Sequence, residues 1–457
     1  MIVMKFGGTS VQDAEAIRRA AEIVRSRLPE KPVVVVSAMA KVTDQLVAMC
    51  EAATRGDKAK ALDLARQVRE RHYSAAGELL GTAVFSRFHE QLEEDFDSLD
   101  ELLGGIAAVG ECTPRSSDRA LAFGELVSSK MIAAAFSAWG IPARYIDSRD
   151  CIVTNSNFTR AVPDFDETTA RLKSSLGPLL SDSSAPLMGG FIAANDQGLT
   201  TTLGRGGSDF SAAIVGAGLG AERIEIWTDV DGMMTTDPRL FPGARRIKVI
   251  SFDEAAELAY FGAKVLHPAT LLPAIQKNIP VLVLNARNPK NPGTRIVARA
   301  PASRNVFKAI AVKRHITIVD IAAARMLMAH GFLRSVFEVF DRHRCPVDMV
   351  STSEVSVSLT IDSNEAIPAI AADLDAIADV KYEGRKAIIC LVGDNLRART
   401  GIAADVFGAL GDVNVRMISQ GASEINISFV IDEADVQRAV ERLHKKFFAE
   451  LDPEVFE

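Results

Sequence analysis

Up to about residue 298, apolar residues follow two alternating patterns, short continuous runs and longer stretches with helical spacing. Ile2–Phe6 and Pro32–Met39 are short apolar runs, typical of strands that are buried on both faces. Between them, Asp13–Leu28 repeats apolar residues with the period of a helix. Similar runs return at Pro142–Asp147, Ala185–Ala193, Arg223–Trp227 and Ile279–Asn285. Strands alternating with helices predict an α/β fold with a mostly parallel central sheet and helices on both faces.

Helical segments interrupt this alternation. Residues 44–103 have a helical, charged pattern, in which Gly56 and Gly77 are the expected breaks. Arg119–Trp139 predicts one long amphipathic helix. Ser251–Glu254 is a capping box, which predicts the start of another helix.

Beyond about Val306 the chain changes to short β and α segments that repeat. A shift of 70 residues without gaps aligns Gly331–Asp362 with Gly401–Asp432 and indicates an internal duplication. Each copy is predicted as strand, helix, strand, strand, helix, the arrangement of ferredoxin-like α+β modules. Neither copy concentrates catalytic residue types, so the pair favours ligand sensing or assembly over a second catalytic site.

Composition excludes several classes of protein. The net charge of -7 over 457 residues argues against a general nucleic-acid binder. The apolar runs are shorter than the roughly 18 residues of a membrane span, and Met1–Gly8 is too quickly broken for a signal peptide. Five scattered cysteines suit free thiols in a reducing compartment, and the histidines show no metal-binding spacing. We therefore expect a cytoplasmic protein that binds neither nucleic acid nor membrane and has no protein metal site.

The stretch Thr200–Asp209 is the strongest local signal for chemistry. Its glycines allow close approach of the backbone to a ligand, and Ser208 or Asp209 is expected to cap the helix that follows. Arg205 adds a fork suited to a carboxylate or a phosphate. Lys5 precedes a strand-to-helix glycine turn, at the strand end where open α/β sheets bind ligands. The stretch predicts an anion site at a helix start, and a Gly-rich surface turn is the alternative.

Two further segments have open interpretations. Thr228-Asp-Val-Asp-Gly232 follows a predicted strand and suits either a nucleotide- or metal-facing loop or a hydrated turn. Glu125 has apolar neighbours in a predicted helix, which favours partial burial over the usual solvated position.

Six motifs stand out along the first 268 residues: Lys5-Phe-Gly-Gly-Thr-Ser-Val11, Phe123-Gly-Glu125, Thr202-Leu-Gly-Arg-Gly-Gly-Ser-Asp209, Thr228-Asp229, Thr236-Asp-Pro-Arg239 and Gly262-Ala-Lys-Val-Leu-His-Pro268. Together they resemble aspartate kinase. The tail segments Met328-Ala-His-Gly-Phe-Leu333 and Val347-Asp-Met-Val-Ser-Thr-Ser-Glu-Val355 look most like its lysine-sensitive homodimeric form. The resemblance implies an amino-acid-kinase domain over residues 1–298 and two regulatory ACT domains over residues 306–380 and 385–457. It implies ATP-dependent phosphorylation of the side-chain carboxylate of L-aspartate, the first step of the aspartate-family pathway, with feedback inhibition by lysine.

The same resemblance assigns roles to individual residues. Lys5 and Asp209 are catalytic: Lys5 meets the transferring phosphate and Asp209 organises that lysine. Arg205 holds the α-carboxylate of aspartate, Glu125 receives its ammonium group and Thr43 makes a further substrate contact. The implied ATP-binding residues are Lys5, Gly7, Gly8, Ser10, Thr228, Asp229, Asp237, Arg239 and Lys264. Mg²⁺ is expected to be held mainly by the ATP phosphates and water.

The regulatory region carries the implied effector site. Its residues are Met328, Gly331, Phe332, Leu333, Asp348, Ser353 and Glu354. Two ACT modules joined edge to edge imply a homodimer or a dimer of dimers. Asp231 stands before Gly232 where relatives often have proline, which leaves the shape of that loop open. His330 stands where lysine-sensitive relatives often have serine, so lysine binding of altered strength and a different effector are both alternatives.

Two other functions stay open on the sequence. Another amino-acid kinase of the same fold, acting on glutamate or acetylglutamate, is the first, although such kinases usually lack the paired ACT module. A non-catalytic amino-acid sensor that keeps the kinase fold is the second, and the presence of Lys5, Arg205 and Asp209 argues against it.

Overall fold

The structure is a computed structural model that describes residues 1–262, 268–322 and 330–457. The chain forms two compact units. Unit 1 contains Met1–Met233 and Val265–Arg299, and unit 2 contains Met234–Lys264 and Ala300–Glu457. The segment Met234–Lys264 thus packs with the C-terminal region, although the sequence analysis places it in the first domain. The predicted domain boundaries stay a prediction.

The central sheet of unit 1 has its strands in the order β3-β5-β2-β1-β8-β10-β11. They are β1 (Ile2–Phe6), β2 (Pro32–Val36), β3 (Ala143–Ile146), β5 (Ala185–Gly189), β8 (Ile224–Thr228), β10 (Val281–Asn285) and β11 (Thr294–Val297). Neighbouring strands pair in parallel from β3 to β10, and β11 is antiparallel to β10. A small second sheet joins β4 (Val153–Thr154), β6 (Ile192–Asn195) and β7 (Thr200–Thr202). The predicted α/β class with a mostly parallel sheet is confirmed.

The helices of unit 1 differ in one place from the sequence prediction. They are η1 (Gly8–Val11), α1 (Ala14–Arg27), η2 (Leu28–Glu30), α2 (Val42–Thr54), α3 (Lys58–Leu79), α4 (Thr82–Val109), α5 (Pro114–Leu121), α6 (Phe123–Ala138), α7 (Ser148–Cys151), α8 (Phe165–Ser181), α9 (Gly207–Leu219), η3 (Pro268–Leu271) and α11 (Leu272–Gln276). Gly56 does separate two helices, with a φ of 79°, whereas Gly77 lies inside α3. The predicted helix Arg119–Trp139 corresponds to α5 and α6, which are separated only at Ala122, and helical backbone bonds continue across that residue, from the Ala122 amide to the Asp118 carbonyl and from the Leu126 amide to the Ala122 carbonyl.

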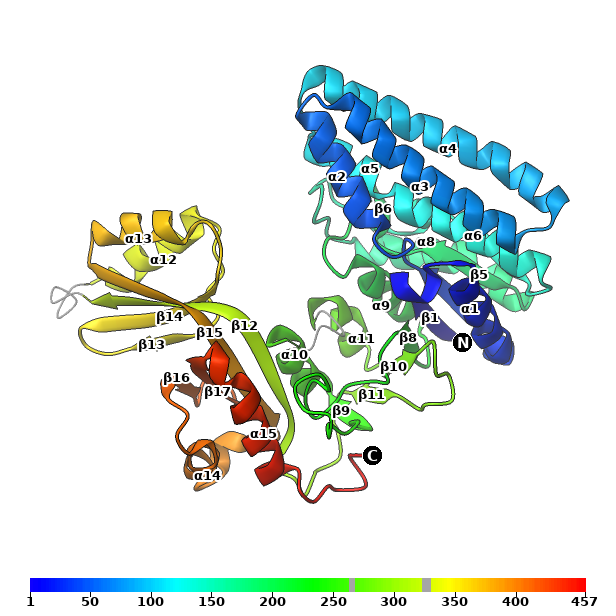
Figure 1. Ribbon diagram of the computed structural model, residues 1–457. Coiled ribbons are helices and arrows are strands. Elements are labelled where there is room, and N and C mark those ends of the chain that lie inside the picture. The colour runs from blue at the N-terminus through cyan, green and yellow to red at the C-terminus, as the bar shows by residue number, and fades with distance from the viewer. Residues whose placement is uncertain (263–267, 323–329) are drawn as a thin grey trace. The chain divides into compact units, whose positions relative to one another are not determined.

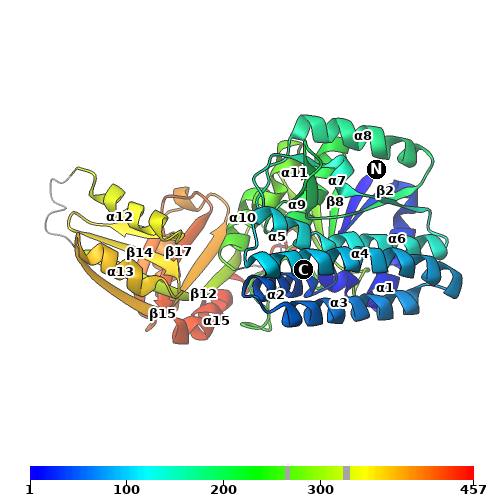
Figure 2. The same ribbon diagram turned by 90° about the horizontal axis from the view of Figure 1, so that it is seen from above.

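Long helices cover one face of the unit 1 sheet. In both views, α2, α3 and α4 lie side by side (Figures 1 and 2). Because side chains alternate along a strand, Ile2, Met4 and Phe6 of β1 join the core under these helices. Lys5 therefore points to the opposite face, and the structure gives it a partner on α9 there.

One helical stretch of unit 1 is long and apolar enough to cross a membrane, judged by length and composition alone. It is Pro114–Ala138, and its most apolar window is 78% buried inside the protein. Such burial is what a core helix of a folded domain shows.

The larger part of unit 2 is a sheet in the order β13-β14-β12-β15-β17-β16. Its strands are β12 (Phe307–Ala322), β13 (Val350–Thr352), β14 (Ser356–Asp362), β15 (Asp379–Gly393), β16 (Val415–Gln420) and β17 (Asn426–Asp432). Its other elements are β9 (Val249–Ser251), α10 (Phe252–Tyr260), α12 (Phe332–Arg342), α13 (Ile367–Asp375), η5 (Leu396–Ala398), α14 (Ile402–Leu410), η6 (Glu433–Asp435) and α15 (Val436–Phe447). The capping box predicted at Ser251 is confirmed at the start of α10.

The sequence duplication appears in the structure as matching elements. Gly331 precedes α12 and Gly401 precedes α14, both with positive φ, of 85° and 77°. The two copies are interleaved, because residues 307–313 of β12 pair with the second half of β15, which also pairs with β17. The second copy thus takes a strand from the start of the first.

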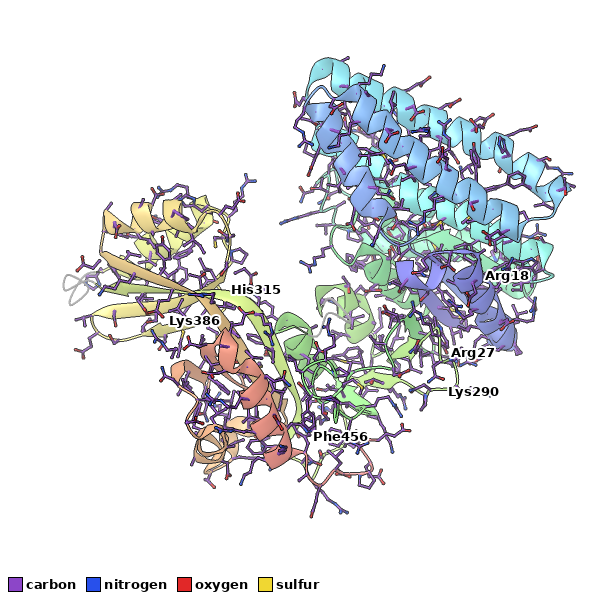
Figure 3. The ribbon with its side chains drawn as sticks, viewed as in Figure 1. Arg18, Arg27, Lys290, His315, Lys386 and Phe456 are labelled. Atoms are coloured by element: carbon purple, nitrogen blue, oxygen red, sulfur yellow. The ribbon has the colours of Figure 1, made fainter. Side chains whose placement is uncertain are left out.

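The last residues of the chain pack inside unit 2. Val455 and Phe456 are buried, and the Lys248 amide donates to the Val455 carbonyl at 2.7 Å. Figure 3 labels Phe456 at this position. The C-terminal residues are therefore part of the core of unit 2.

Candidate active site

The ends of four neighbouring strands place the predicted site residues of unit 1 at one edge of the sheet. Phe6 of β1 stands in register with Val36 of β2 and Trp227 of β8, and Val36 with Gly189 of β5. The loops after these strands carry the conspicuous glycines and hydroxyl residues of the sequence. Carboxyl ends of parallel strands are the usual ligand-binding edge of an open α/β sheet.

Lys5 and Asp209 form a shielded ion pair at this edge. Lys5 Nζ lies 2.6 Å from Asp209 Oδ1, and the two side chains are only 11% and 12% exposed. Lys5 comes from the end of β1 and Asp209 from the first turn of α9. Because this ion pair is shielded from water, it holds the Lys5 ammonium group in one position. The predicted pairing of these two residues is therefore present in the structure.

The start of α9 differs from the sequence prediction. Neither Ser208 nor Asp209 caps the helix: the capping residue is Gly206, with a φ of 72° and no side-chain bond. A Cβ on Gly190 would lie 2.6 Å from the Ser208 Cβ, so the turn after β5 packs directly against α9. With its side chain on Lys5, Asp209 is not available to cap its own helix.

The loop after β1 has backbone suited to a close approach. A Cβ on Gly7 would lie 3.5 Å from Lys5 Nζ, and one on Gly8 would lie 3.0 Å from the Ala38 carbonyl oxygen. The Ser10 hydroxyl donates to the Trp227 carbonyl at 3.2 Å. The loop after β1 therefore contacts both the loop after β2 and the end of β8.

Glu125 is a buried carboxyl group in the first turn of α6. Its side chain is 4% exposed, and Oε2 has no hydrogen-bond partner among the described residues. Burial raises the pKa of Glu125 to about 8, although the Ala38 amide and the charge of Lys5 act in the opposite direction. Ser128 and Ser129 donate to its backbone carbonyl. Such a group is suited to receive a cation, which would supply the missing partner.

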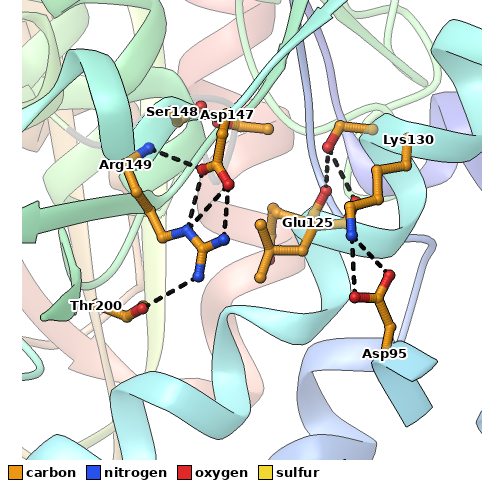
Figure 4. A network of polar contacts seen from close by, with 10 residues as sticks. Asp95, Glu125, Lys130, Asp147, Ser148, Arg149 and Thr200 are labelled. Atoms are coloured by element: carbon orange, nitrogen blue, oxygen red, sulfur yellow. Dashed lines mark hydrogen bonds and ion pairs between the residues drawn. The ribbon is translucent and has the colours of Figure 1, made fainter. Parts of the chain in front are cut away.

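Arg205 and Thr43 are more exposed than Glu125 and the Lys5–Asp209 pair. Arg205 is exposed in the loop before α9, and Thr43 is half-buried in the first turn of α2. Arg205 follows β7, and Figure 4 shows Thr200 of that strand accepting a bond from Arg149, which is paired with Asp147. The substrate contacts of Thr43 and Arg205 stay predictions.

Asp118 is a residue that the sequence analysis missed. Its side chain is fully buried in α5 and accepts bonds from the Thr202 amide at 3.1 Å, the Thr202 hydroxyl at 2.6 Å and the Thr159 amide at 2.9 Å. Burial raises its pKa, while these hydrogen bonds oppose the shift. A Cβ on Gly204 would lie 3.2 Å from the Thr159 carbonyl. Asp118 therefore holds the stem of the loop that carries Arg205. No sequence signal marks it, since Asp118 lies in a polar helical pattern.

The predicted ATP-binding residues are divided between the units. Thr228 donates to Asp229 at 3.2 Å at the end of β8 in unit 1. Asp237 and Arg239 lie in unit 2 and pair with each other at 2.7 Å. Lys264 lies outside the described residues. The role of each of them in binding ATP stays a prediction.

The predicted effector residues lie on the first copy of the duplication. Asp348 is almost buried, whereas Gly331, Leu333, Ser353 and Glu354 are exposed. Phe332 opens α12 and is half-buried. Met328 lies outside the described residues.

Within the described residues, no group of three or more His, Cys, Asp or Glu side chains is placed to hold a metal ion. The acidic residues near the sheet edge are engaged elsewhere, Asp209 by Lys5 and Asp229 by Thr228. This donor set fits a magnesium ion that arrives with a nucleotide and keeps phosphate and water ligands.

Comparisons with known proteins agree with this architecture. Residues 1–285 match the amino acid kinase family, and residues 389–447 match an ACT domain. Fold and site thus define a regulated small-molecule kinase.

Comparisons with individual relatives identify the family of kinases more closely. The chain is 40% identical to chloroplastic aspartokinase 3 of Arabidopsis thaliana, over 98% of this chain and 81% of that relative. It is 38% identical to the lysine-sensitive aspartokinase 3 of Escherichia coli, over 98% of this chain and 99% of that relative. A crystal structure of E. coli aspartokinase III with aspartate and ADP superposes with a TM-score of 0.84 and 36% identity, covering 98% and 100% of the two chains. The chain belongs to the aspartokinases.

Proposed function

We propose that this chain transfers the γ-phosphoryl group of ATP to the side-chain carboxylate of L-aspartate, with Lys5 and Asp209 at the reacting centre. The products are 4-phospho-L-aspartate and ADP. The observation that carries the proposal is the shielded Lys5–Asp209 pair at the ligand-binding edge of the sheet, in a chain that belongs to the aspartokinases. The E. coli structure with aspartate and ADP supports the same pair of ligands for this chain.

The chemistry needs positioning and charge neutralisation more than proton transfer. A carboxylate is already ionised at neutral pH, so its oxygen attacks the γ-phosphorus without a general base. The new P–O bond forms as the bond to the bridging oxygen breaks, and ADP leaves with that electron pair. The Lys5 ammonium stabilises the negative charge on the transferring group, and Asp209 keeps the ammonium in position.

Aspartate binding then requires one cation and one anion of the protein. Arg205 offers a bidentate fork to the α-carboxylate, Glu125 accepts the ammonium group and Thr43 adds a contact. Because Oε2 of Glu125 is buried without a partner among the described residues, the arriving ammonium satisfies it and favours its ionised form.

The nucleotide occupies the loops after β1 and β8. Gly7, Gly8 and Ser10 contact phosphate oxygens, while Thr228 and Asp229 line the remainder of the site in unit 1. The remaining proposed ATP-binding residues lie beyond residue 233 of the chain and are Asp237, Arg239 and Lys264. When bound, Mg²⁺ neutralises phosphate charge, and it is held mainly by phosphates and water.

Regulation by lysine acts through the ACT modules of unit 2. The lysine-sensitive E. coli relative and the ACT match support lysine as the effector. The proposed effector residues are Met328, Gly331, Phe332, Leu333, Asp348, Ser353 and Glu354. A homodimer or a dimer of dimers through the ACT modules, and a cytoplasmic location, complete the proposal.

The test is the substrate assay with hydroxylamine, which traps the acyl phosphate as a hydroxamate. ATP and L-aspartate should give hydroxamate, while glutamate and acetylglutamate should give none. Lys5→Ala should lower kcat by about 100-fold or more with the fold intact, because charge stabilisation in the transition state is lost. Lys60→Ala, an exposed lysine of α3, is the matched control. Activity on glutamate alone refutes the substrate, and near-wild-type activity of Lys5→Ala refutes the role of Lys5.

A further inference from the structure

Arg71 of α3 contacts the backbone of two different loops in unit 1. Its Nη1 donates to the Ala40 carbonyl at 2.6 Å, and its Nη2 donates to the Gln12 carbonyl at 2.9 Å. Gln12 ends η1 in the loop after β1, and Ala40 lies in the loop between β2 and α2. One guanidinium group therefore joins three segments of the chain, because its planar fork presents donors in fixed directions.

The two loops also contact each other at Gly8. The Ala40 amide donates to the Gly8 carbonyl at 3.2 Å, and a Cβ on Gly8 would lie 3.4 Å from the Ala40 Cα. Ala40 is thus held through both of its backbone polar groups, by the loop after β1 and by Arg71. The next residue, Lys41, has a positive φ of 67° and precedes the first turn of α2. A residue with a side chain keeps such a backbone only where its surroundings hold it.

The charge of Arg71 is not neutralised by a carboxylate. Arg69, two positions earlier on α3, pairs with three carboxylates of α4, those of Glu93, Asp97 and Asp100. Arg71 forms no ion pair among the described residues and gives its donors to carbonyl oxygens instead. Two effects of this side chain are therefore possible, directed hydrogen bonds to the loops and a positive charge beside them. Substitution by lysine separates the two, because lysine keeps the charge but lacks the planar fork.

The position of these two loops relative to each other matters for phosphoryl transfer. In the proposed function, the loop after β1 holds phosphate oxygens, and Thr43 contacts aspartate from the first turn of α2. Thr43 lies three residues after Ala40, and Ser10 lies two residues before Gln12. The two reacting groups are thus carried by the two loops that Arg71 joins. A displacement of about 1 Å between reacting groups can lower the rate about 100-fold.

We propose that Arg71 is a positioning residue of the kinase, which fixes the phosphate-binding loop after β1 against the aspartate-binding loop after β2. It acts through the Gln12 and Ala40 carbonyls. The inference rests on the proposed function, because that function assigns the ligands of the two loops. Without the guanidinium group, the two loops move separately, while each of them keeps the residues that bind its own ligand.

The first test measures amide hydrogen exchange in the full chain without ligands. In Arg71→Met, peptides that cover residues 37–45 should exchange at least about fivefold faster than in wild type, because the Ala40 carbonyl has lost its donor. Arg18→Met is the matched control, since Arg18 of α1 donates at 2.7 Å to the Glu78 carbonyl in the last turn of the same helix α3. Exchange of residues 37–45 that is as slow in Arg71→Met as in Arg18→Met overturns the link between the two loops.

The second test separates kcat from KM in the hydroxamate assay. Arg71→Met should lower kcat at least about tenfold, with the KM for ATP and the KM for aspartate each changed by less than about threefold, because each loop keeps its own contacts. Arg18→Met should keep the wild-type kcat. A kcat of Arg71→Met within about twofold of wild type, or a loss confined to KM, overturns the positioning role.

The variant Arg71→Lys distinguishes the hydrogen bonds from the charge. Lysine keeps the positive charge but cannot reproduce the two parallel bonds, so its kcat should stay at least about fivefold below wild type. A wild-type kcat in Arg71→Lys shows that the charge alone suffices and overturns the proposal. If Arg71→Met is unfolded at the assay temperature, Arg71→Lys is the deciding variant in both tests.

The two readouts separate this inference from the proposed function. A wild-type chain that forms no hydroxamate, together with faster exchange in Arg71→Met, refutes the kinase assignment and supports the link between the two loops. A wild-type chain that phosphorylates aspartate, with the same exchange and kcat in Arg71→Met as in Arg18→Met, refutes the inference and leaves the kinase assignment standing.

Discussion

The buried carboxyl of Glu125 predicts that aspartate binding depends steeply on pH. The proposed contact with the substrate ammonium requires the ionised carboxylate, whereas burial raises the pKa of Glu125 from its ordinary value of 4.5 to about 8. Only about 1% of Glu125 is then ionised at pH 6 and about half at pH 8. Since apparent affinity scales with the competent fraction, the KM for aspartate should fall about 50-fold between these two values.

The assay is the initial rate against aspartate concentration, at saturating ATP and constant ionic strength, in steps from pH 6 to pH 8. Neither the carboxylates nor the ammonium of aspartate changes charge appreciably in this window. The change of KM with pH therefore reflects ionisation in the enzyme and not in aspartate. Glu125→Gln should raise the KM at pH 8 and remove most of its pH dependence. A KM in the wild-type enzyme that varies less than about threefold over the window refutes the reasoning.

Three further outcomes follow from buried polar groups. In the folded state Glu125 binds a proton between its unfolded pKa and about pH 8, so its contribution to stability falls as pH rises through this window. The Tm of Glu125→Gln should therefore rise relative to the Tm of wild type from pH 6 to pH 8. Two Tm values that fall in parallel contradict this. Lys308→Met leaves the carboxylate of Glu254, 3% exposed, without its cation and should cost about 3–5 kcal/mol in urea unfolding, much of which Glu254→Gln in the same chain should restore. A double variant as unstable as Lys308→Met argues against the charge as the cause. Asp118→Ala removes the acceptor of the Thr159 amide, the Thr202 amide and the Thr202 hydroxyl, so the KM for aspartate should rise about tenfold and more than that for ATP, and equal changes in both would contradict a role at the Arg205 loop.

Much of the fold was predictable because its signals are local. The apolar runs predicted β1, β2, β8 and β10 to within a few residues, and the capping box at Ser251 predicted the start of α10. These signals work because each depends on neighbours within a few positions of the chain. The predicted break at Gly77 was wrong, because a glycine inside an otherwise helical pattern is tolerated, and Gly77 lies within α3.

By itself, the sequence determined the α/β class, the duplication, the membership implied by the motifs and the residue types of the site. Tertiary structure decided which of those residues meet. Lys5 and Asp209 are 204 positions apart, so no local pattern shows that the lysine takes the carboxylate away from the helix cap. Asp118 looks like a surface residue until the fold buries it against β7, and α10 looks like part of the kinase until its side chains pair with the regulatory sheet. The physical reason is the same in each case: periodicity records which face of an element is buried, whereas a polar contact between distant segments exists only after the sheet has brought them together.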